Sequence, residues 1–185
     1  MTRAHAADGG PGPTNEPGAN LPSSTVPFVA VICGSTSDLP RMEEALPLLT
    51  ELGVRHELRV LSAHRSPALL ERYVTEAAER GARVFVCAAG LAAHLAGAVA
   101  ARTARPVIGL PMPGGVADGL DALLSTVQMP AGVPVATVGV GNARNALLLA
   151  SQILGVADPF IAARIGEYRA AQMRRVEAGQ VPDQS

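Results

Sequence analysis

Aromatic residues are scarce in this chain of 185 residues: they make up 3% of it, and tryptophan is absent. Hydrophobic residues nevertheless reach 48%, so a core has to be built mainly from alanine, valine, leucine and isoleucine. Small and branched side chains of this kind are typical of helices packed closely on a parallel sheet. The length suits one domain with a sizeable core and is too short for two full-sized domains.

The chain also lacks an excess of charge. Its formal net charge is −1 and it contains no basic run, which argues against an extended surface for nucleic acid or for an anionic membrane. No apolar stretch reaches membrane-spanning length, and the N-terminus lacks the compact apolar segment of a signal peptide. We therefore expect a cytoplasmic protein that binds neither nucleic acid nor membrane, whereas a small anionic ligand is compatible with this composition.

Cysteine occurs only twice. Cys33 and Cys87 each lie inside an apolar run, and their spacing is typical of neither a metal site nor a disulfide framework. The sequence therefore predicts two buried thiols in a reducing compartment and no metal site.

Three segments of the chain differ in composition. Residues 1–25 are rich in glycine, proline, asparagine and alanine, which predicts a disordered tail. Residues 26–157 carry the apolar runs of one domain. Residues 158–185 contain an extra C-terminal helix with a patchy apolar face, which we expect to dock on another subunit. Packing of this helix across its own domain is the alternative.

The segment 26–157 alternates between apolar runs and helical patterns. Strands are predicted at 26–33, 56–63, 83–89, 106–111 and 133–140. Helices are predicted after Asp38, after Ser66, and at 92–102, 118–127 and 142–154. We expect Ser37 or Asp38 to cap the first helix, and Pro47 to kink or divide it. The alternation predicts an α/β fold, a three-layer α/β/α sandwich around a parallel sheet.

Polar or glycine-rich turns follow the first four predicted strands. They are GSTSD (34–38), SAHRSP (62–67), AGLAAH (89–94) and PMPGGVADG (111–119). Ligands of parallel α/β sheets bind beyond the carboxyl ends of the strands. We therefore expect these turns to face one crevice.

Two of these turns carry groups suited to a phosphorylated ligand. Backbone N–H groups and hydroxyls of 34–38 favour a phosphate, and Asp38 could accept hydrogen bonds from a ribose diol. Arg65 could hold a phosphate through two hydrogen bonds. Histidine side chains titrate near neutral pH, so His64 could transfer a proton. The alternatives are simple helix capping at 34–38, a solvated turn around His64 and Arg65, and a buried His94 that bonds to the backbone.

In combination, these turns resemble a known family. The sequence is similar to the PurE family of purine biosynthesis, the carboxyaminoimidazole ribonucleotide mutases. The segments that carry the resemblance are GSTSD, SAHRSP, AGLAAHLAG and STVQMPAGVPVATVGVGNARNALLLASQIL. The resemblance covers about residues 27–156 in uninterrupted order. It implies a flavodoxin-like parallel sheet and a homo-octamer whose active sites include residues of neighbouring subunits, with neither metal nor cofactor.

The resemblance also implies a reaction and the residues that serve it. The substrate would lose carbon dioxide from its carbamate nitrogen, and ring carbon 4 of aminoimidazole ribonucleotide would attack the trapped carbon dioxide. His64 matches the general acid/base that handles the displaced proton. Arginine rather than lysine at position 65 resembles the mutase branch of the family. The matching substrate-binding residues are Ser35, Ser37, Asp38, Ser62, Ala63, Arg65, Gly90 and His94.

Three loops depart from the usual family pattern. Leu91 stands where a glycine is usual, and Asp118 occupies a serine position. The turn at 141–145 is shortened and lacks the usual lysine, for which Arg144 could substitute. Two alternatives therefore stay open: a divergent carboxylase or decarboxylase of a related heterocyclic nucleotide, and a non-catalytic subunit that binds a phosphorylated metabolite. His64 argues against the second, because a binding subunit has no evident need for it.

Overall fold

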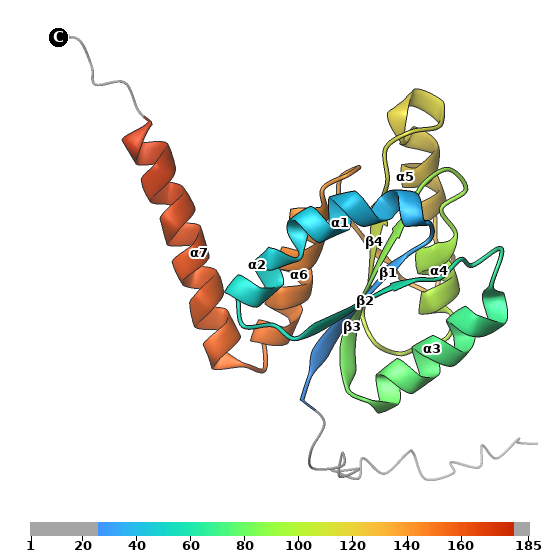
Figure 1. Ribbon diagram of the computed structural model, residues 1–185, viewed down its shortest axis with the longest axis horizontal. Coiled ribbons are helices and arrows are strands. Elements are labelled where there is room, and N and C mark those ends of the chain that lie inside the picture. Colours follow the sequence, from blue (N-terminus) through green and yellow to red (C-terminus); the bar gives the residue numbers. More distant parts are fainter. Residues whose placement is uncertain (1–25, 180–185) are drawn as a thin grey trace, which may run out of the picture.

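A five-stranded parallel sheet forms the centre of the protein, in a computed structural model that describes residues 26–179 (Figure 1). The strand order is β2-β1-β3-β4-β5, the order of flavodoxin-like folds. The predicted 1–25 tail lies outside the described residues. The strands are β1 (Phe28–Cys33), β2 (His56–Val60), β3 (Ala82–Ala89), β4 (Val107–Pro111) and β5 (Ala136–Thr137).

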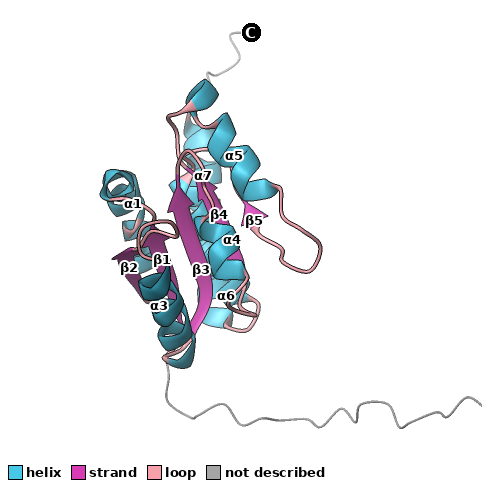
Figure 2. Ribbon diagram, turned by 90° about the vertical axis from the view of Figure 1, so that its right-hand side faces the viewer, coloured by secondary structure: helices cyan, strands magenta, loops and turns pink. Residues whose placement is uncertain are grey.

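Helices cover both faces of this sheet, so the predicted three-layer sandwich is confirmed (Figure 1, Figure 2). One face carries α1 (Leu39–Ala45), α2 (Pro47–Glu51), α6 (Ala143–Gly155) and α7 (Pro159–Ala178). The other carries α3 (Pro67–Glu79), α4 (Leu95–Ala100) and α5 (Leu120–Val127). Among residues 26–179, no helix is both long and apolar enough to cross a membrane.

Strand β1 shows why apolar runs without alternation belong to this architecture. All six of its residues are buried, because Val29 and Val31 face the α1/α6 layer while Phe28 and Ile32 face the α3/α4 layer. Pro47 divides the helix after β1 into α1 and α2, as predicted, since proline lacks the N–H that would continue the helical ladder.

The predicted strand 133–140 is wrong in length. Only Ala136 and Thr137 pair with β4, opposite Ile108 and Gly109. Pro134 has no N–H to donate to a ladder. After Thr137, two isolated bonds join the chain to β4, from Val138 N to Gly109 O and from Gly141 N to Pro111 O. The last strand is therefore a short sheet edge.

Gly109 in β4 lets α5 lie close to the sheet. A Cβ at this position would overlap the methyl group of Thr126 and lie 3.0 Å from Val135. Thr126 is buried, and its hydroxyl donates to the carbonyl of Ala122 at 2.7 Å. We expect Gly109→Ala to lower the free energy of unfolding by about 1–3 kcal/mol, because the overlap forces the helix away. Urea denaturation measures it.

A second substitution makes this test specific. Thr126→Ser removes the overlapping methyl and keeps the hydroxyl, so the double variant should recover much of the lost stability. Gly166→Ala in α7 is the matched control, since nothing lies within 4 Å of the added Cβ. Wild-type stability of Gly109→Ala would contradict the packing argument.

The two cysteines are free and buried, as predicted. Burial raises the pKa of Cys33 to about 12, and the carboxylates of Asp38 and Glu43 add to the rise. Burial likewise raises the pKa of Cys87. Because the thiolate is the reactive form, we expect neither thiol of the native protein to react with an aromatic disulfide reagent at about pH 8, and both to react after unfolding in urea. Prompt reaction of the native protein would contradict this.

Helix α7 packs partly on its own chain. The carboxylate of Asp158 caps it by accepting from the N–H groups of Phe160 and Ile161 at 3.0 and 3.4 Å. Ile161 and Ile165 are buried against the core, whereas Phe160 and Met173 are exposed. Figure 1 shows the helix extending away from the sheet. Docking of its exposed side on another subunit stays a prediction.

Candidate active site

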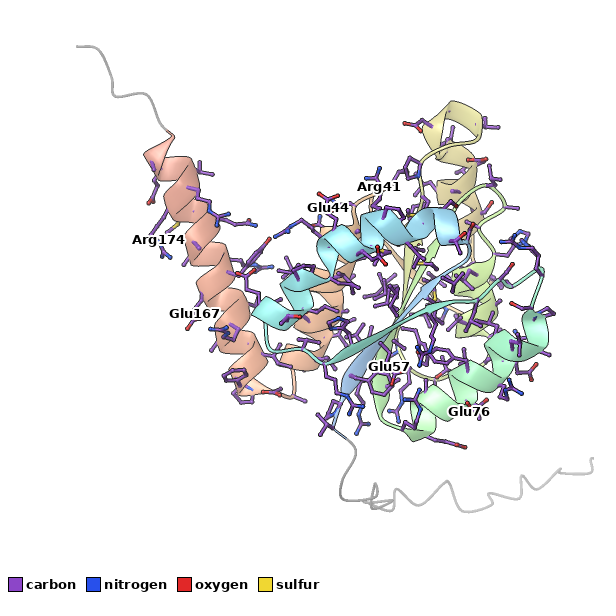
Figure 3. The ribbon with its side chains drawn as sticks, in the orientation of Figure 1. Arg41, Glu44, Glu57, Glu76, Glu167 and Arg174 are labelled. Atoms are coloured by element: carbon purple, nitrogen blue, oxygen red, sulfur yellow. The ribbon has the colours of Figure 1, made fainter. Side chains whose placement is uncertain are left out.

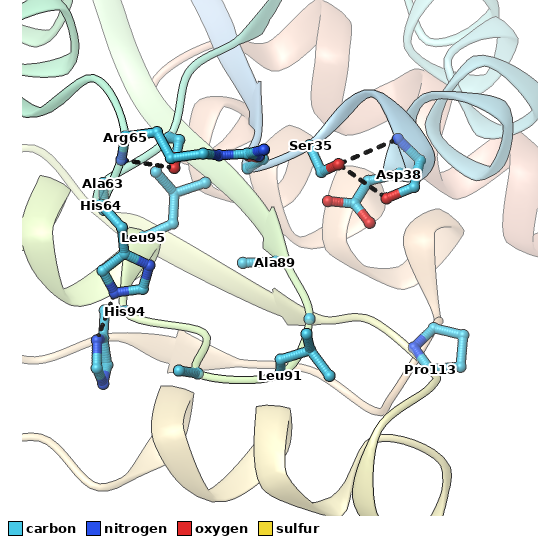
Figure 4. A pocket seen from close by; sticks show the side chains of 15 residues that line it. Ser35, Asp38, Ala63, His64, Arg65, Ala89, Leu91, His94, Leu95 and Pro113 are labelled. Carbon is cyan, nitrogen blue, oxygen red and sulfur yellow. Dashed lines mark hydrogen bonds between the residues drawn. The ribbon is translucent and has the colours of Figure 1, made fainter.

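The four polar turns meet around one cavity of about 580 Å³ at the carboxyl ends of the strands (Figure 4). The prediction that these turns face one crevice is therefore confirmed. Every residue proposed from the sequence for the site lines this cavity: Ser35, Ser37, Asp38, Ser62, Ala63, His64, Arg65, Gly90 and His94.

The turn after β1 presents two hydroxyl groups. Ser35 Oγ accepts hydrogen bonds from the Ser37 N–H at 3.3 Å and from the Ser37 hydroxyl at 2.9 Å. The prediction that Ser37 or Asp38 caps the helix is therefore wrong. A 3₁₀ turn, Thr36–Asp38, precedes α1, so Ser35 caps that turn, and the Asp38 side chain makes no capping bond and lines the cavity.

Asp38 is the unusual group of this cavity. Its residue is only 7% exposed, and its Oδ2 finds no hydrogen-bond partner within the described part of the chain. Burial raises the pKa of Asp38, and hydrogen bonding from the Ser35 backbone and the Ser37 side chain offsets only part of that rise. Buried polar atoms without partners are rare and costly. The orphaned oxygen therefore suits a ligand with hydroxyl donors.

The turn after β2 is fixed by its own serines. The Ser62 N–H donates to Ser66 Oγ at 3.0 Å, and the Ser66 hydroxyl donates to the Ser62 carbonyl at 3.1 Å. The Arg65 N–H donates to Ser62 Oγ at 3.1 Å, and its guanidinium Nη2 reaches the Gly34 carbonyl at 3.2 Å. This network holds His64 and Arg65 at the exposed tip of the turn, beside the turn after β1.

His64 and His94 form a direct pair. His64 Nε2 lies 2.8 Å from His94 Nδ1, with ring centroids 5.0 Å apart and planes at 77°. Both residues are exposed, so the alternative of a buried His94 bonded to the backbone is wrong. The turn 91–93 ahead of α4 carries the ring to the cavity mouth. Sequence gave no signal for this contact, because 30 residues separate the partners.

Leu91 closes one side of the cavity at a cost in backbone energy. Its φ is 55°, a left-handed conformation that costs a residue with a Cβ about 1–2 kcal/mol. The side chain is exposed and lies against Gly115, and Pro113 lines the same cavity. Asp118 does not line the cavity, because its carboxylate accepts from the Gly114 N–H at 2.9 Å within its own loop.

Arg144 does not supply a charge to this cavity. It lines a separate hollow of about 390 Å³ with Arg41 and Glu44, whose side chains lie on α1 (Figure 3). Its guanidinium donates to the Tyr168 hydroxyl at 3.2 Å. In residues 26–179, no group of three histidine, cysteine, aspartate or glutamate side chains could hold a metal ion.

Comparison with known proteins agrees with this geometry. The sequence model of the AIR carboxylase family matches residues 28–175. A Pyrococcus horikoshii protein named N5-carboxyaminoimidazole ribonucleotide mutase is 49% identical over 83% of this chain and 87% of its own. A Mycobacterium tuberculosis protein of that name is 56% identical over 78% and 83%. The crystal structure of Treponema denticola PurE superposes with a TM-score of 0.75 at 27% identity, over 83% of this chain and 96% of its own. The chain therefore belongs to the AIR carboxylase family.

Proposed function

We propose that this protein is an isomerase of de novo purine biosynthesis. It moves a carboxylate from the exocyclic nitrogen of N5-carboxyaminoimidazole ribonucleotide to ring carbon 4. The observation that carries the proposal is the orphaned Asp38 oxygen in the same cavity as His64 and Arg65. These residues offer an acceptor for hydroxyls, a proton carrier and an anion-binding cation. The mutase names of two relatives at 49% and 56% identity support the same substrate.

Binding of the ribose phosphate is assigned to the turns after β1 and β2. The Arg65 guanidinium donates one N–H to the Gly34 carbonyl, which leaves further donors for a phosphate. Ser35 and Ser37, which carry hydroxyl groups, line the same cavity. Asp38 accepts hydrogen bonds from the ribose hydroxyls, which gives its buried oxygen a partner.

The reaction requires two proton transfers, one to the exocyclic nitrogen and one from ring carbon 4. When the carbamate bond breaks, carbon dioxide leaves and the nitrogen takes up a proton. When ring carbon 4 attacks carbon dioxide, a new carbon–carbon bond forms and the proton on that carbon departs. His64 carries both protons. Ala63, Ala89 and Leu95 line the cavity with apolar side chains, which favours retention of carbon dioxide and exclusion of water.

We also propose a cytoplasmic homo-octamer that uses no metal or cofactor. Exposed apolar side chains at Phe160 and Met173 of α7 and at Leu124 of α5 support association, and two free buried thiols support a reducing compartment. Light scattering behind a sizing column should give a mass eight times that of the chain. A monomer at micromolar concentration would contradict the octamer.

A second candidate is a carboxylase or decarboxylase of a related heterocyclic nucleotide. It is favoured by Leu91, which lines the cavity where the family usually has glycine. A spectrophotometric assay with N5-carboxyaminoimidazole ribonucleotide and with its carbon-4 isomer separates the two candidates. Rapid interconversion in both directions is the expected result. A folded protein that binds aminoimidazole ribonucleotide but converts neither isomer would overturn the mutase and favour the second candidate.

A further inference from the structure

One of the two ring nitrogens of His64 already has a hydrogen-bond partner. Its Nε2 is hydrogen-bonded to His94 Nδ1 at 2.8 Å, and Figure 4 shows the other ring nitrogen, Nδ1, on the cavity side. His94 is exposed, so water can reach its Nε2. The pair thus forms a line from the cavity, through two rings, to solvent.

One hydrogen atom is shared between the two rings, and its position decides what His64 offers to the cavity. If His94 Nδ1 holds the hydrogen, it donates to His64 Nε2, and a neutral His64 carries its own hydrogen on Nδ1 as an acid. If His64 Nε2 holds the hydrogen, it donates to His94, and His64 Nδ1 is a bare base. Both arrangements keep the same hydrogen bond.

We infer that His94 is a positioning residue that switches His64 between its acid and base forms within each turnover. The inference rests on the proposed function, which needs both forms in one reaction. It differs from the prediction that His94 binds substrate, because here His94 acts through His64.

The proton steps balance. As the bond from nitrogen to the carboxylate carbon breaks, its electron pair stays on nitrogen and takes the proton of His64 Nδ1. The shared hydrogen moves from His94 to His64 Nε2, and water supplies a proton to His94 Nε2. When ring carbon 4 bonds to carbon dioxide, its proton passes to His64 Nδ1. The shared hydrogen then returns, and His94 Nε2 releases a proton to water. At the end of the cycle, both rings have returned to their starting protonation states.

The decisive variant is His94→Asn. The asparagine amide lies near the position of Nδ1, so it can hold the His64 ring but cannot pass a proton through itself. We expect kcat to fall at least about tenfold in both directions and KM to stay within about threefold. The solvent isotope effect on kcat should curve with deuterium fraction in the wild type, because several protons move, and become linear in the variant. Wild-type kcat in His94→Asn would overturn the inference.

A measurement without substrate keeps this inference separate from the proposed function. In nitrogen-15 spectra of the histidine rings, His64 of the wild type should show both tautomers in exchange, and His94→Phe should leave one. His56→Asn is the matched control, since His56 lies outside the cavity and contacts the Val54 carbonyl. Identical His64 ring signals in the wild type and His94→Phe would overturn the inference itself. Failure of the wild type to turn over would instead overturn the proposed function, and with it the role in turnover, while the coupling of the two rings would still be seen in these spectra.

Discussion

Replacing His64 by asparagine is expected to lower kcat by about 10²–10⁴-fold in both directions, the usual contribution of a general acid/base. Asparagine keeps a polar group of similar reach but does not exchange a proton near neutral pH. Within residues 26–179, the side chain of His64 is hydrogen-bonded to His94 and not to the residues assigned to phosphate and ribose. Affinity for aminoimidazole ribonucleotide should therefore stay within about threefold.

Two measurements define the outcome for His64. Calorimetry gives the dissociation constant of aminoimidazole ribonucleotide, and the spectrophotometric assay gives kcat for each direction. His56→Asn serves as the control for removal of a histidine, because His56 lies at the start of β2 away from the cavity. A His64→Asn protein that still turns over at the wild-type rate would remove His64 from the mechanism.

The fold was predictable because its signals are local. The apolar run at 28–33 has no alternation, and such a run in a chain of alternating strands and helices indicates a strand covered on both faces. β1 is fully buried, as that pattern requires. The length of β5 was not predictable from hydrophobicity, because Val135 and Val140 continue the apolar pattern beyond the two residues that pair.

Residues that line the site were predictable for a topological reason. Carboxyl ends of parallel strands meet at one edge of a sheet, so turns separated by up to about 80 residues of sequence share one cavity. The pattern could not reveal how side chains meet there. Neither the contact of His64 with His94 nor the choice of Ser35 over Asp38 as a cap follows from spacing, because both depend on where each turn leaves its strand.

Leu91 was predictable from the sequence in part. Its place in a glycine position was visible in the sequence as a departure, and the structure gives the departure a conformation: a positive φ that glycine adopts without strain. The structure also places the leucine side chain against Gly115. That contact joins loops after β3 and β4, and no local pattern encodes it.

Asp38→Asn is expected to have opposite effects on binding and stability. Loss of a charged acceptor for the ribose hydroxyls should weaken ribonucleotide binding by about 10-fold to 100-fold, because a hydrogen bond to a charged group contributes about 1.5–3 kcal/mol. Without ligand, the substitution replaces a buried carboxylate, one oxygen of which has no partner, by a neutral amide, whose burial costs less. The free energy of unfolding at pH 7 should therefore rise by about 1 kcal/mol.

The pH dependence of this gain follows from the raised pKa of Asp38, whose ordinary value is 3.8. Between that value and the raised one, the folded protein binds the proton more tightly than the unfolded chain. The contribution of Asp38 to stability is therefore most favourable below 3.8 and is lost as pH rises through the raised pKa. Urea denaturation at about pH 4 and pH 7 should show a larger advantage of Asp38→Asn at pH 7. A group that serves a ligand lowers the stability of the ligand-free protein, so its removal should raise that stability. An Asp38→Asn protein that is less stable than the wild type at pH 7 and binds ribonucleotide equally well would therefore mean that Asp38 is a structural carboxylate.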